Sequence, residues 1–116
     1  MNSTREQLSD LLIAVENELR TLGLWQQKTP PPQALASTEP FAIDKLSFNQ
    51  WLQFIFLPRM AEILESTSAL PESCSVAPMA EEFCKAEQVD GTSLIRHLAA
   101  TDKLITHQKL DVYEAF

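Results

Sequence analysis

The most regular pattern of apolar positions lies near the N-terminus, where leucine and valine recur at intervals of three and four residues. Side chains at this spacing share one face of an α-helix, and we predict a helix over residues 4–22. Ser3 and Glu6 have the spacing of a capping box at its start. Gly23 stands where a left-handed residue commonly ends a helix. The inward face contains Leu8, Leu11, Leu12, Val15, Leu19 and Leu22.

The most apolar stretch is "QWLQFIFLPRM", residues 50–60. Ser47 and Gln50 form a second capping-box pattern at its start. The four successive apolar residues Phe54–Leu57 cover the whole circumference of a helix, since neighbouring residues lie about 100° apart around its axis. We therefore predict that this helix is central in the fold.

Pro58 interrupts this apolar helix. An interior proline costs about 3 kcal/mol, because it removes a hydrogen bond and its ring clashes with the carbonyl four residues back. Burial of the apolar neighbours, at about 1.5 to 3 kcal/mol each, outweighs that cost. We predict that the chain stays helical on both sides, with a kink or break at Leu57.

Residues 24–46, between the first two helices, are rich in proline and have no sustained periodicity. Pro30, Pro31 and Pro32 favour an extended polyproline path. A flexible linker rarely carries much apolar surface, so we predict a long connection that packs against the helices. Its apolar residues are Trp25, Leu35, Phe41, Ile43 and Leu46.

Two further helices are predicted, over Pro78–Glu87 and Thr92–Lys109. Asp90 or Thr92 would cap the second one, and no alternating strand pattern of useful length occurs. The fold class is therefore all-α, a bundle-like array of four or five helices with a proline-rich packed connection, in one domain over residues 1–116. The inward residues would be Met79, Phe83 and Cys84 in the first of these helices and Leu94, Ile95, Leu98 and Ile105 in the second.

The net charge of −7, from 16 acidic and 9 basic side chains, repels phosphate backbones and anionic membranes. We therefore expect no direct nucleic-acid binding. The N-terminus lacks the pattern of a signal peptide, and no apolar run approaches the roughly 18 residues that span a bilayer. These features predict a cytoplasmic protein without a membrane segment.

Cys74 and Cys84 have neither a C-x-x-C nor a zinc-site spacing, and we expect reduced thiols. Lys85 could lower the pKa of Cys84 and make it reactive. The preferred interpretation is a small buried hydrophobic residue. Whether either thiol is reactive stays open at this point.

No catalytic or metal-binding constellation stands out. His97 and His107 lie ten residues apart on one helix, so they point roughly 80° apart across about 15 Å and cannot share a metal. Gly23 and Gly91 stand alone rather than in a phosphate-binding loop. We expect no metal and no cofactor.

Two sets of charged residues are candidate sites. Asp44 in the connection would meet Arg59 beside the proline if the connection folds back, forming a structural or ligand-binding polar pair; alternatively, Arg59 reaches water. Arg96, Lys103 and His107 fall on one helix face and could meet an acidic partner or a phosphate. A solvated outer face is the preferred interpretation of that basic stripe, because Asp102 is close in sequence.

The chain strongly resembles the YqcC-like family of small bacterial proteins in four segments: "GLWQ", "STEPFAID", "WLQFIFLPRM" and "LPESCSVAPMAEE". The resemblance runs from the first helix through Asp102. It implies an all-α fold of four or five helices and no established biochemical activity. Family members are often encoded beside a tRNA pseudouridine synthase of the C type, which implies a role near RNA modification. This chain is too short and too poor in strand patterns to be such a synthase itself.

The preferred functional hypothesis is a non-catalytic interaction or accessory protein that binds a protein partner, for which the resemblance suggests an RNA-modifying enzyme. Trp25, Phe41 and Trp51 would form its surface unless the chain itself covers them as core. The alternative is a small-molecule-binding protein or enzyme with a pocket beside Pro58, where Arg59 and Asp44 would supply polar groups. The oligomeric state is left open.

Overall fold

The computed structural model describes residues 3–66 and 69–107, and every regular element within them is helical. This confirms the all-α fold. α3, the π-helix η2 and α4 follow one another without a break, so the described residues form four long helical segments, the short α2 and one 3₁₀ turn. The elements are α1 (Thr4–Thr21), α2 (Pro32–Leu35), the 3₁₀ helix η1 (Pro40–Ala42), α3 (Phe48–Trp51), η2 (Leu52–Phe56), α4 (Leu57–Glu65), α5 (Ala77–Glu87) and α6 (Thr92–Thr106).

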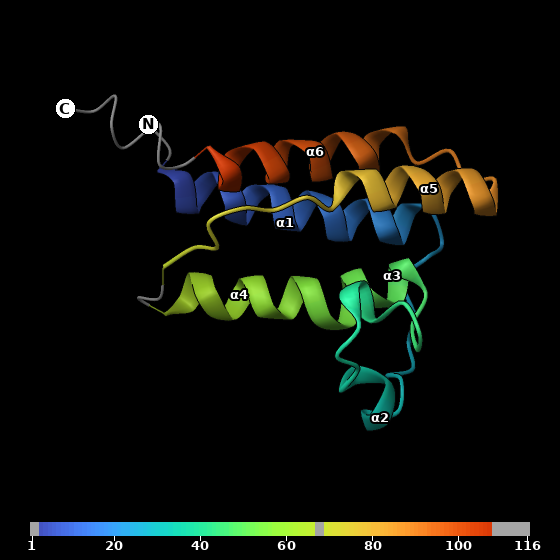
Figure 1. The fold of residues 1–116 in the computed structure, drawn as a ribbon. Helices are drawn as coiled ribbons and strands as arrows, with labels where there is room; N and C mark the ends of the chain where they lie inside the picture. The colour runs from blue at the N-terminus through green and yellow to red at the C-terminus, as the bar shows by residue number, and fades with distance from the viewer. Residues whose placement is uncertain (1–2, 67–68, 108–116) are drawn as a thin grey trace.

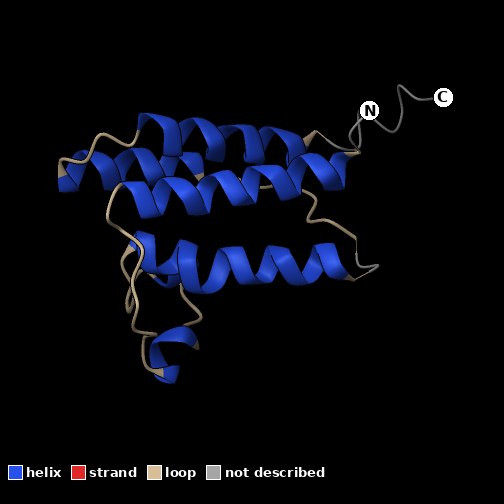
Figure 2. Cartoon of the chain, turned by 180° about the vertical axis from the view of Figure 1, so that it is seen from behind, coloured by secondary structure: helices blue, strands red, loops and turns tan. Residues whose placement is uncertain are grey.

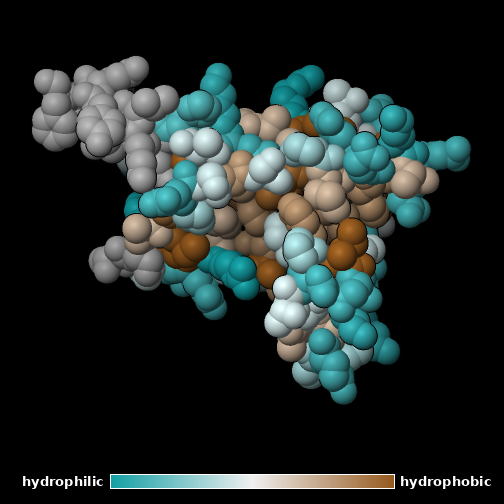
Figure 3. Space-filling model, viewed as in Figure 1, coloured by the Kyte–Doolittle hydropathy of each residue, from teal (hydrophilic) through white to brown (hydrophobic). Residues whose placement is uncertain are grey.

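The long helices form two layers (Figures 1 and 2). α6 packs against α1 and α5 in one layer, and α4 runs antiparallel to α1 in the other. The connection that carries α2 projects from the end of the molecule where α3 lies. Hydrophobic side chains show between the layers and hydrophilic ones cover the outer edges (Figure 3). The fully buried apolar side chains are Leu8, Val15, Leu19, Leu52, Ala80, Leu94, Leu98 and Ile105.

α1 begins and ends as its sequence predicts. The Ser3 hydroxyl accepts the Glu6 backbone N–H at 3.1 Å. At the other end Leu24 N–H donates to the Leu19 carbonyl at 2.9 Å, and Gly23 has a φ of 73°. These contacts form the Schellman ending that a glycine without a Cβ adopts easily.

The proline-rich connection is packed, as predicted, around a small apolar cluster of Ala34, Ala42 and Leu46. Two details differ from the prediction. Pro32 opens α2 instead of continuing an extended path, because a proline fits the first turn of a helix. Ile43 is 66% exposed rather than packed, because the chain turns through positive φ at Phe41 and Ala42 just before it.

The backbone stays helical through Leu57 and Pro58, so the predicted break at Leu57 is wrong. Leu57 has helical angles, φ −61° and ψ −46°. The helix instead widens into η2, where Leu57 N–H donates to the carbonyl of Leu52, five residues back. A π-helical turn shifts the preceding carbonyls relative to the proline ring, which relieves the clash of an α-helical register. The helix does continue on both sides, as predicted.

The predicted central position of this helix is also wrong. α1 occupies the middle, because it packs against α6 on one side and α4 on the other. Of the four successive apolar residues Phe54–Leu57, only Phe56 is buried. Phe54, Ile55 and Leu57 therefore stay partly open to solvent in the described part of the chain.

α5 and α6 match their predicted positions. α5 starts at Ala77, one residue before Pro78, and α6 extends to Thr106; Lys109 lies outside the described residues. The Asp90 carboxylate accepts the Thr92 hydroxyl at 2.8 Å and its N–H at 3.3 Å. The N-cap residue of α6 is Gly91 rather than either predicted residue, and Asp90 just before it satisfies the first N–H of the helix. These hydrogen bonds hold the pKa of Asp90 below its usual range.

Gly91 is required by close packing. A Cβ at this position would lie 2.3 Å from the Cys84 sulfur. We expect Gly91→Ala to lower the free energy of unfolding by about 1 to 3 kcal/mol. In urea denaturation, Cys84→Ala should recover part of that loss in the double variant, since it removes the clashing atom. Strictly additive effects of the two substitutions would contradict this explanation.

Candidate functional site

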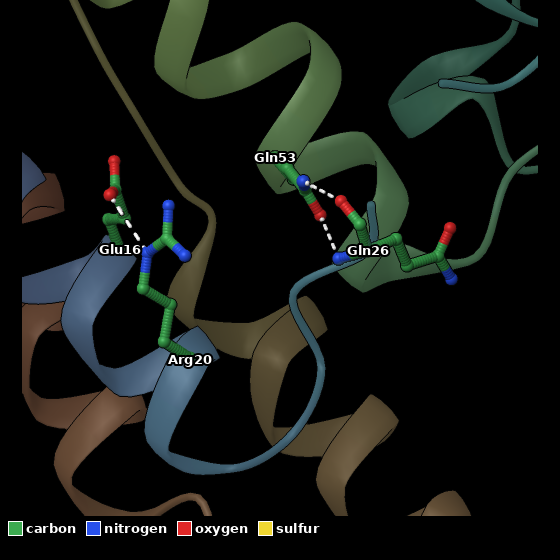
Figure 4. A network of polar contacts seen from close by, with 4 residues as sticks. All are labelled: Glu16, Arg20, Gln26 and Gln53. Atoms are coloured by element: carbon green, nitrogen blue, oxygen red, sulfur yellow. Dashed lines mark hydrogen bonds and ion pairs between the residues drawn. The ribbon is translucent and has the colours of Figure 1, made fainter. Parts of the chain in front are cut away.

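Gln53 in η2 pairs with the backbone that follows α1. Its side chain is only 7% exposed. Its Oε1 accepts the Gln26 N–H at 2.8 Å, and its Nε2 donates to the Gln26 carbonyl at 2.7 Å (Figure 4). One side chain thus satisfies both backbone groups of Gln26, as a neighbouring β-strand would.

Two neighbouring amides extend this contact. Asn49 donates to the Leu24 carbonyl at 3.0 Å, and Gln50 donates to the Gln26 side chain at 3.1 Å. Side-chain amides do not ionise near neutral pH, so this network holds segments together and supplies no acid or base. This network was not predicted from the sequence, although polar residues 49, 50 and 53 inside an otherwise apolar helix were the available signal.

The three candidate aromatic residues lie in two places. Phe41 and Trp51 touch, with ring centroids 4.8 Å apart in an edge-to-face arrangement. Trp25 lies beneath the Arg20 guanidinium, which is 4.4 Å from its ring centroid, and Arg20 also pairs with Glu16 at 3.1 Å (Figure 4). All three aromatic side chains are half-buried against the core. They are therefore neither fully covered nor a freely exposed patch.

The structure does not bring Asp44 and Arg59 together as an ion pair. Asp44 is exposed and accepts a hydrogen bond from the Ser37 hydroxyl in the same connection. Arg59 is exposed in the first turn of α4, on the other side of the π-helix. The local turn satisfies the carboxylate, and the guanidinium reaches water.

The basic stripe lies on the outside of α6, where Arg96, Lys103 and His107 are all exposed. Lys103 and His107 also line a groove of about 530 Å³ between α1 and α6, and the lining of that groove does not include Arg96. The other lining residues of this groove are Gln7, Asp10, Leu11, Ala100 and Leu104.

Asp102 does not neutralise the basic stripe; it turns towards the start of α5. Its carboxylate accepts the backbone N–H groups of Val76 at 2.9 Å and Ala77 at 2.8 Å. One turn later, the Thr106 hydroxyl accepts the Cys74 N–H at 3.1 Å. Asp102 and Thr106 thus fasten the chain before α5 to α6.

Both cysteines are free thiols with suppressed ionisation. Burial, together with the hydrogen bond and negative charge of Asp102, raises the pKa of Cys74 to about 12. Burial and the nearby Asp90 charge also raise the pKa of Cys84, which is a buried residue of the α5 face. The structure therefore confirms the packing interpretation of Cys84 and contradicts the lowered pKa considered beside it.

A second groove, of about 270 Å³, runs between α1 and α4 next to the proline. Neither Asp44 nor Arg59 lines it, so the polar groups expected for a pocket beside Pro58 are missing there. Its walls are Ser9, Leu12, Ile13 and Glu16 from α1 and Leu57, Ala61, Leu64 and Glu65 from α4.

The described residues contain neither a metal-binding cluster nor a membrane-spanning helix. Within 3–66 and 69–107, no group of three or more His, Cys, Asp or Glu side chains is placed to hold a metal ion. In the same part of the chain, no helix has the length and apolarity to cross a bilayer.

We expect Asp102→Asn to lower the free energy of unfolding by about 1 to 2 kcal/mol, because a neutral amide replaces a charge-assisted cap at the start of α5. Chemical denaturation would measure the loss. Asp10→Asn, at an exposed position of α1, should change stability by less than about 0.5 kcal/mol. Equal effects of the two substitutions would contradict the role assigned to Asp102.

The raised pKa of Cys74 predicts a pH dependence of stability. The unfolded thiol ionises near its usual pKa of 9.0 and the folded one near about 12, so stability from the neutral thiol is present below pH 9 and is lost as the pH rises. Between about pH 8 and about pH 10.5, the free energy of unfolding should fall more steeply in the wild type than in Cys74→Ser. Identical slopes would show that this thiol does not contribute.

Comparison with known proteins places the chain in a family. Residues 7–104 match the family DUF446, described as tRNA pseudouridine synthase C. An uncharacterized protein of Haemophilus influenzae is 38% identical over 108 residues, which cover 93% of this chain and 97% of that protein. YqcC of Escherichia coli, also uncharacterized, is 29% identical over 102 residues, or 88% of this chain and 94% of YqcC.

The solution NMR structure of Escherichia coli YqcC matches the fold with a TM-score of 0.78 and 28% identity over 90% of each chain. A tRNA pseudouridine synthase C of Pectobacterium carotovorum is 42% identical over 71 residues. Those residues are 61% of this chain but only 19% of that protein, most of which therefore lies outside the match. The predicted resemblance is confirmed: the chain belongs to the DUF446 family and shares its fold with YqcC.

Proposed function

We propose that this protein is a non-catalytic accessory protein that binds a tRNA pseudouridine synthase of the C type. One observation carries the proposal: a protein named as such a synthase contains a segment 42% identical to this chain, and that segment is a fifth of its length. A segment within the same polypeptide is held beside the rest of that protein by covalent linkage. A separate chain of the same family would reach the same arrangement by binding.

The chemistry of the described residues supports an accessory role. The groups with shifted pKa values take part in packing and in helix ends: the two thiols are kept neutral, and Asp90 accepts the first N–H of α6. The polar network around Gln53 consists of amides that bind backbone. A role in positioning or stabilising a partner needs none of these groups to transfer a proton or attack a substrate.

The charge of the chain supports a protein partner over direct RNA contact. An enzyme that binds tRNA needs basic surface to hold the phosphate backbone. A protein with a net charge of −7 is repelled by tRNA and attracted to such basic surface. We place this complex in the cytoplasm, with the tRNA on which the synthase would act.

The small-molecule alternative has less support. The groove beside Pro58 measures about 270 Å³, at the lower edge of the usual size of ligand sites, and lacks the expected Asp44 and Arg59. No observation favours a particular ligand for it.

Titration calorimetry of the purified chain against the tRNA pseudouridine synthase C of the same organism tests the proposal. We expect a stoichiometric complex with a dissociation constant below about 10 µM that weakens as salt is added, because opposite charges meet. Free tRNA titrated into the chain alone is the control and should give no binding signal. Absence of a complex with the synthase would refute the proposed function.

A further inference from the structure

In the part of the chain that the structure describes, α4 keeps some of its apolar surface open to solvent. Its packing partner among the long helices is α1, and Leu57, Ile63 and Leu64 remain half-buried. α4 is amphipathic: Met60 is buried, and the charged residues Arg59, Glu62 and Glu65 are exposed. The position of α4 at one edge of the fold leaves part of its apolar side open to solvent.

Part of this surface lines the groove between α1 and α4. Its α1 residues, 9, 12, 13 and 16, and its α4 residues, 57, 61, 64 and 65, each lie on one helix face over about two turns, or about 10 Å. The two helices run antiparallel, so Leu57 lies towards Glu16 and Glu65 towards Ser9 (Figure 1). At the end of the groove where Glu65 and Ser9 lie, the Arg5 side chain links α1 to α4 by donating to the Ile63 carbonyl at 3.0 Å.

Ile13 stands at the edge of this groove with 59% of its surface exposed. Within residues 3–66 and 69–107, it is one of two large hydrophobic side chains that are exposed; the other is Ile43 in the connection. Burying such a side chain at an interface contributes about 1.5 to 3 kcal/mol. Ile13 is therefore the natural anchor for a partner that fills the groove.

The ionisable side chains that line the groove are acidic, and Arg5 and Arg20 stand beside its two ends. Glu16 and Glu65 come from its opposite ends, and its lining contains no Lys, Arg or His. Glu16 also pairs with Arg20, but both side chains remain largely open to solvent. An apolar floor between two carboxylates fits a helix with an apolar face and basic residues beside it.

We propose that the α1–α4 groove is the docking site for a basic amphipathic helix of the tRNA pseudouridine synthase C partner. This inference rests on the proposed function and assigns the surface through which the chain binds the synthase. The apolar face of the incoming helix covers Ile13, Leu57 and Leu64, and its basic residues approach Glu16 and Glu65. Charge favours this occupant over a second copy of the chain, because two copies would each bring a net charge of −7.

A matched pair of substitutions at the two exposed isoleucines tests the apolar contact. Ile13→Asp should weaken binding to the synthase at least about 10-fold, because it places a charge against the apolar floor. Ile43→Asp makes the same change at a similarly exposed site outside the groove and should leave the affinity unchanged. Ile13→Ala, which adds no charge, should give a smaller loss in the same direction, and circular dichroism should show all three variants folded.

A second pair tests the charge of the partner. Glu65→Lys reverses a charge in the groove and should weaken binding about 5-fold at low salt, with a smaller effect at high salt. Glu87→Lys makes the same change at an exposed position of α5 and should change the affinity by less than about 2-fold. Equal effects of both reversals would show general attraction to a basic protein and would overturn the assigned site.

The outcomes separate the two levels of the proposal. If the wild-type chain does not bind the synthase, both the function and the docking site are refuted. If it binds and Ile13→Asp binds equally well, the function stands and the groove is wrong. If light scattering shows a wild-type dimer that Ile13→Asp dissociates, the groove is occupied by a second copy, which also overturns the proposed occupant.

Discussion

The pairing of the Gln53 side chain with the backbone of Gln26 joins the helix before Pro58 to the segment that leaves α1. Pro58 cannot donate a backbone hydrogen bond, and the helix before it widens into the π-helix Leu52–Phe56 that carries Gln53. The buried amide then binds both backbone groups of the segment leaving α1. Proline, π-helix and amide pair thus act as one unit that sets α4 along α1, and the groove between these helices follows from that placement.

The sequence predicted those parts of the fold that local patterns determine. α1, α5 and α6 appear at their predicted positions, because periodic apolar faces and nearby side chains that accept helix N–H groups, such as Ser3 and Asp90, act within a few residues. The packed connection was also predictable, since a disordered segment rarely carries so many apolar side chains. The helix register at Pro58 was not predictable from the sequence. The stabilisation gained by widening the helix depends on the hydrogen bonds that Gln53 makes with Gln26, 27 residues away.

The candidate site residues were harder to predict for the same reason. Asp102 looks like a surface charge in sequence, yet its partners are backbone groups 25 and 26 residues earlier. Asp44 and Arg59 are plausible partners by charge, but a nearby serine satisfies the carboxylate first. The apolar circumference of the segment around Phe54–Leu57 suggested a central helix, and the structure places it at an edge. That disagreement is informative, because Phe54, Ile55 and Leu57 are only half-buried and Leu57 lines the groove between α1 and α4.

The central claim is that this groove receives a basic helix of a tRNA pseudouridine synthase of the C type. Methyl-resolved NMR of the isoleucine-labelled chain, titrated with the synthase of the same organism, tests it most directly. The account predicts that the Ile13 methyl signal shifts or broadens early in the titration while the Ile43 signal is unchanged. Changes confined to Ile43, or to isoleucines far from the α1–α4 groove such as Ile105, would contradict it.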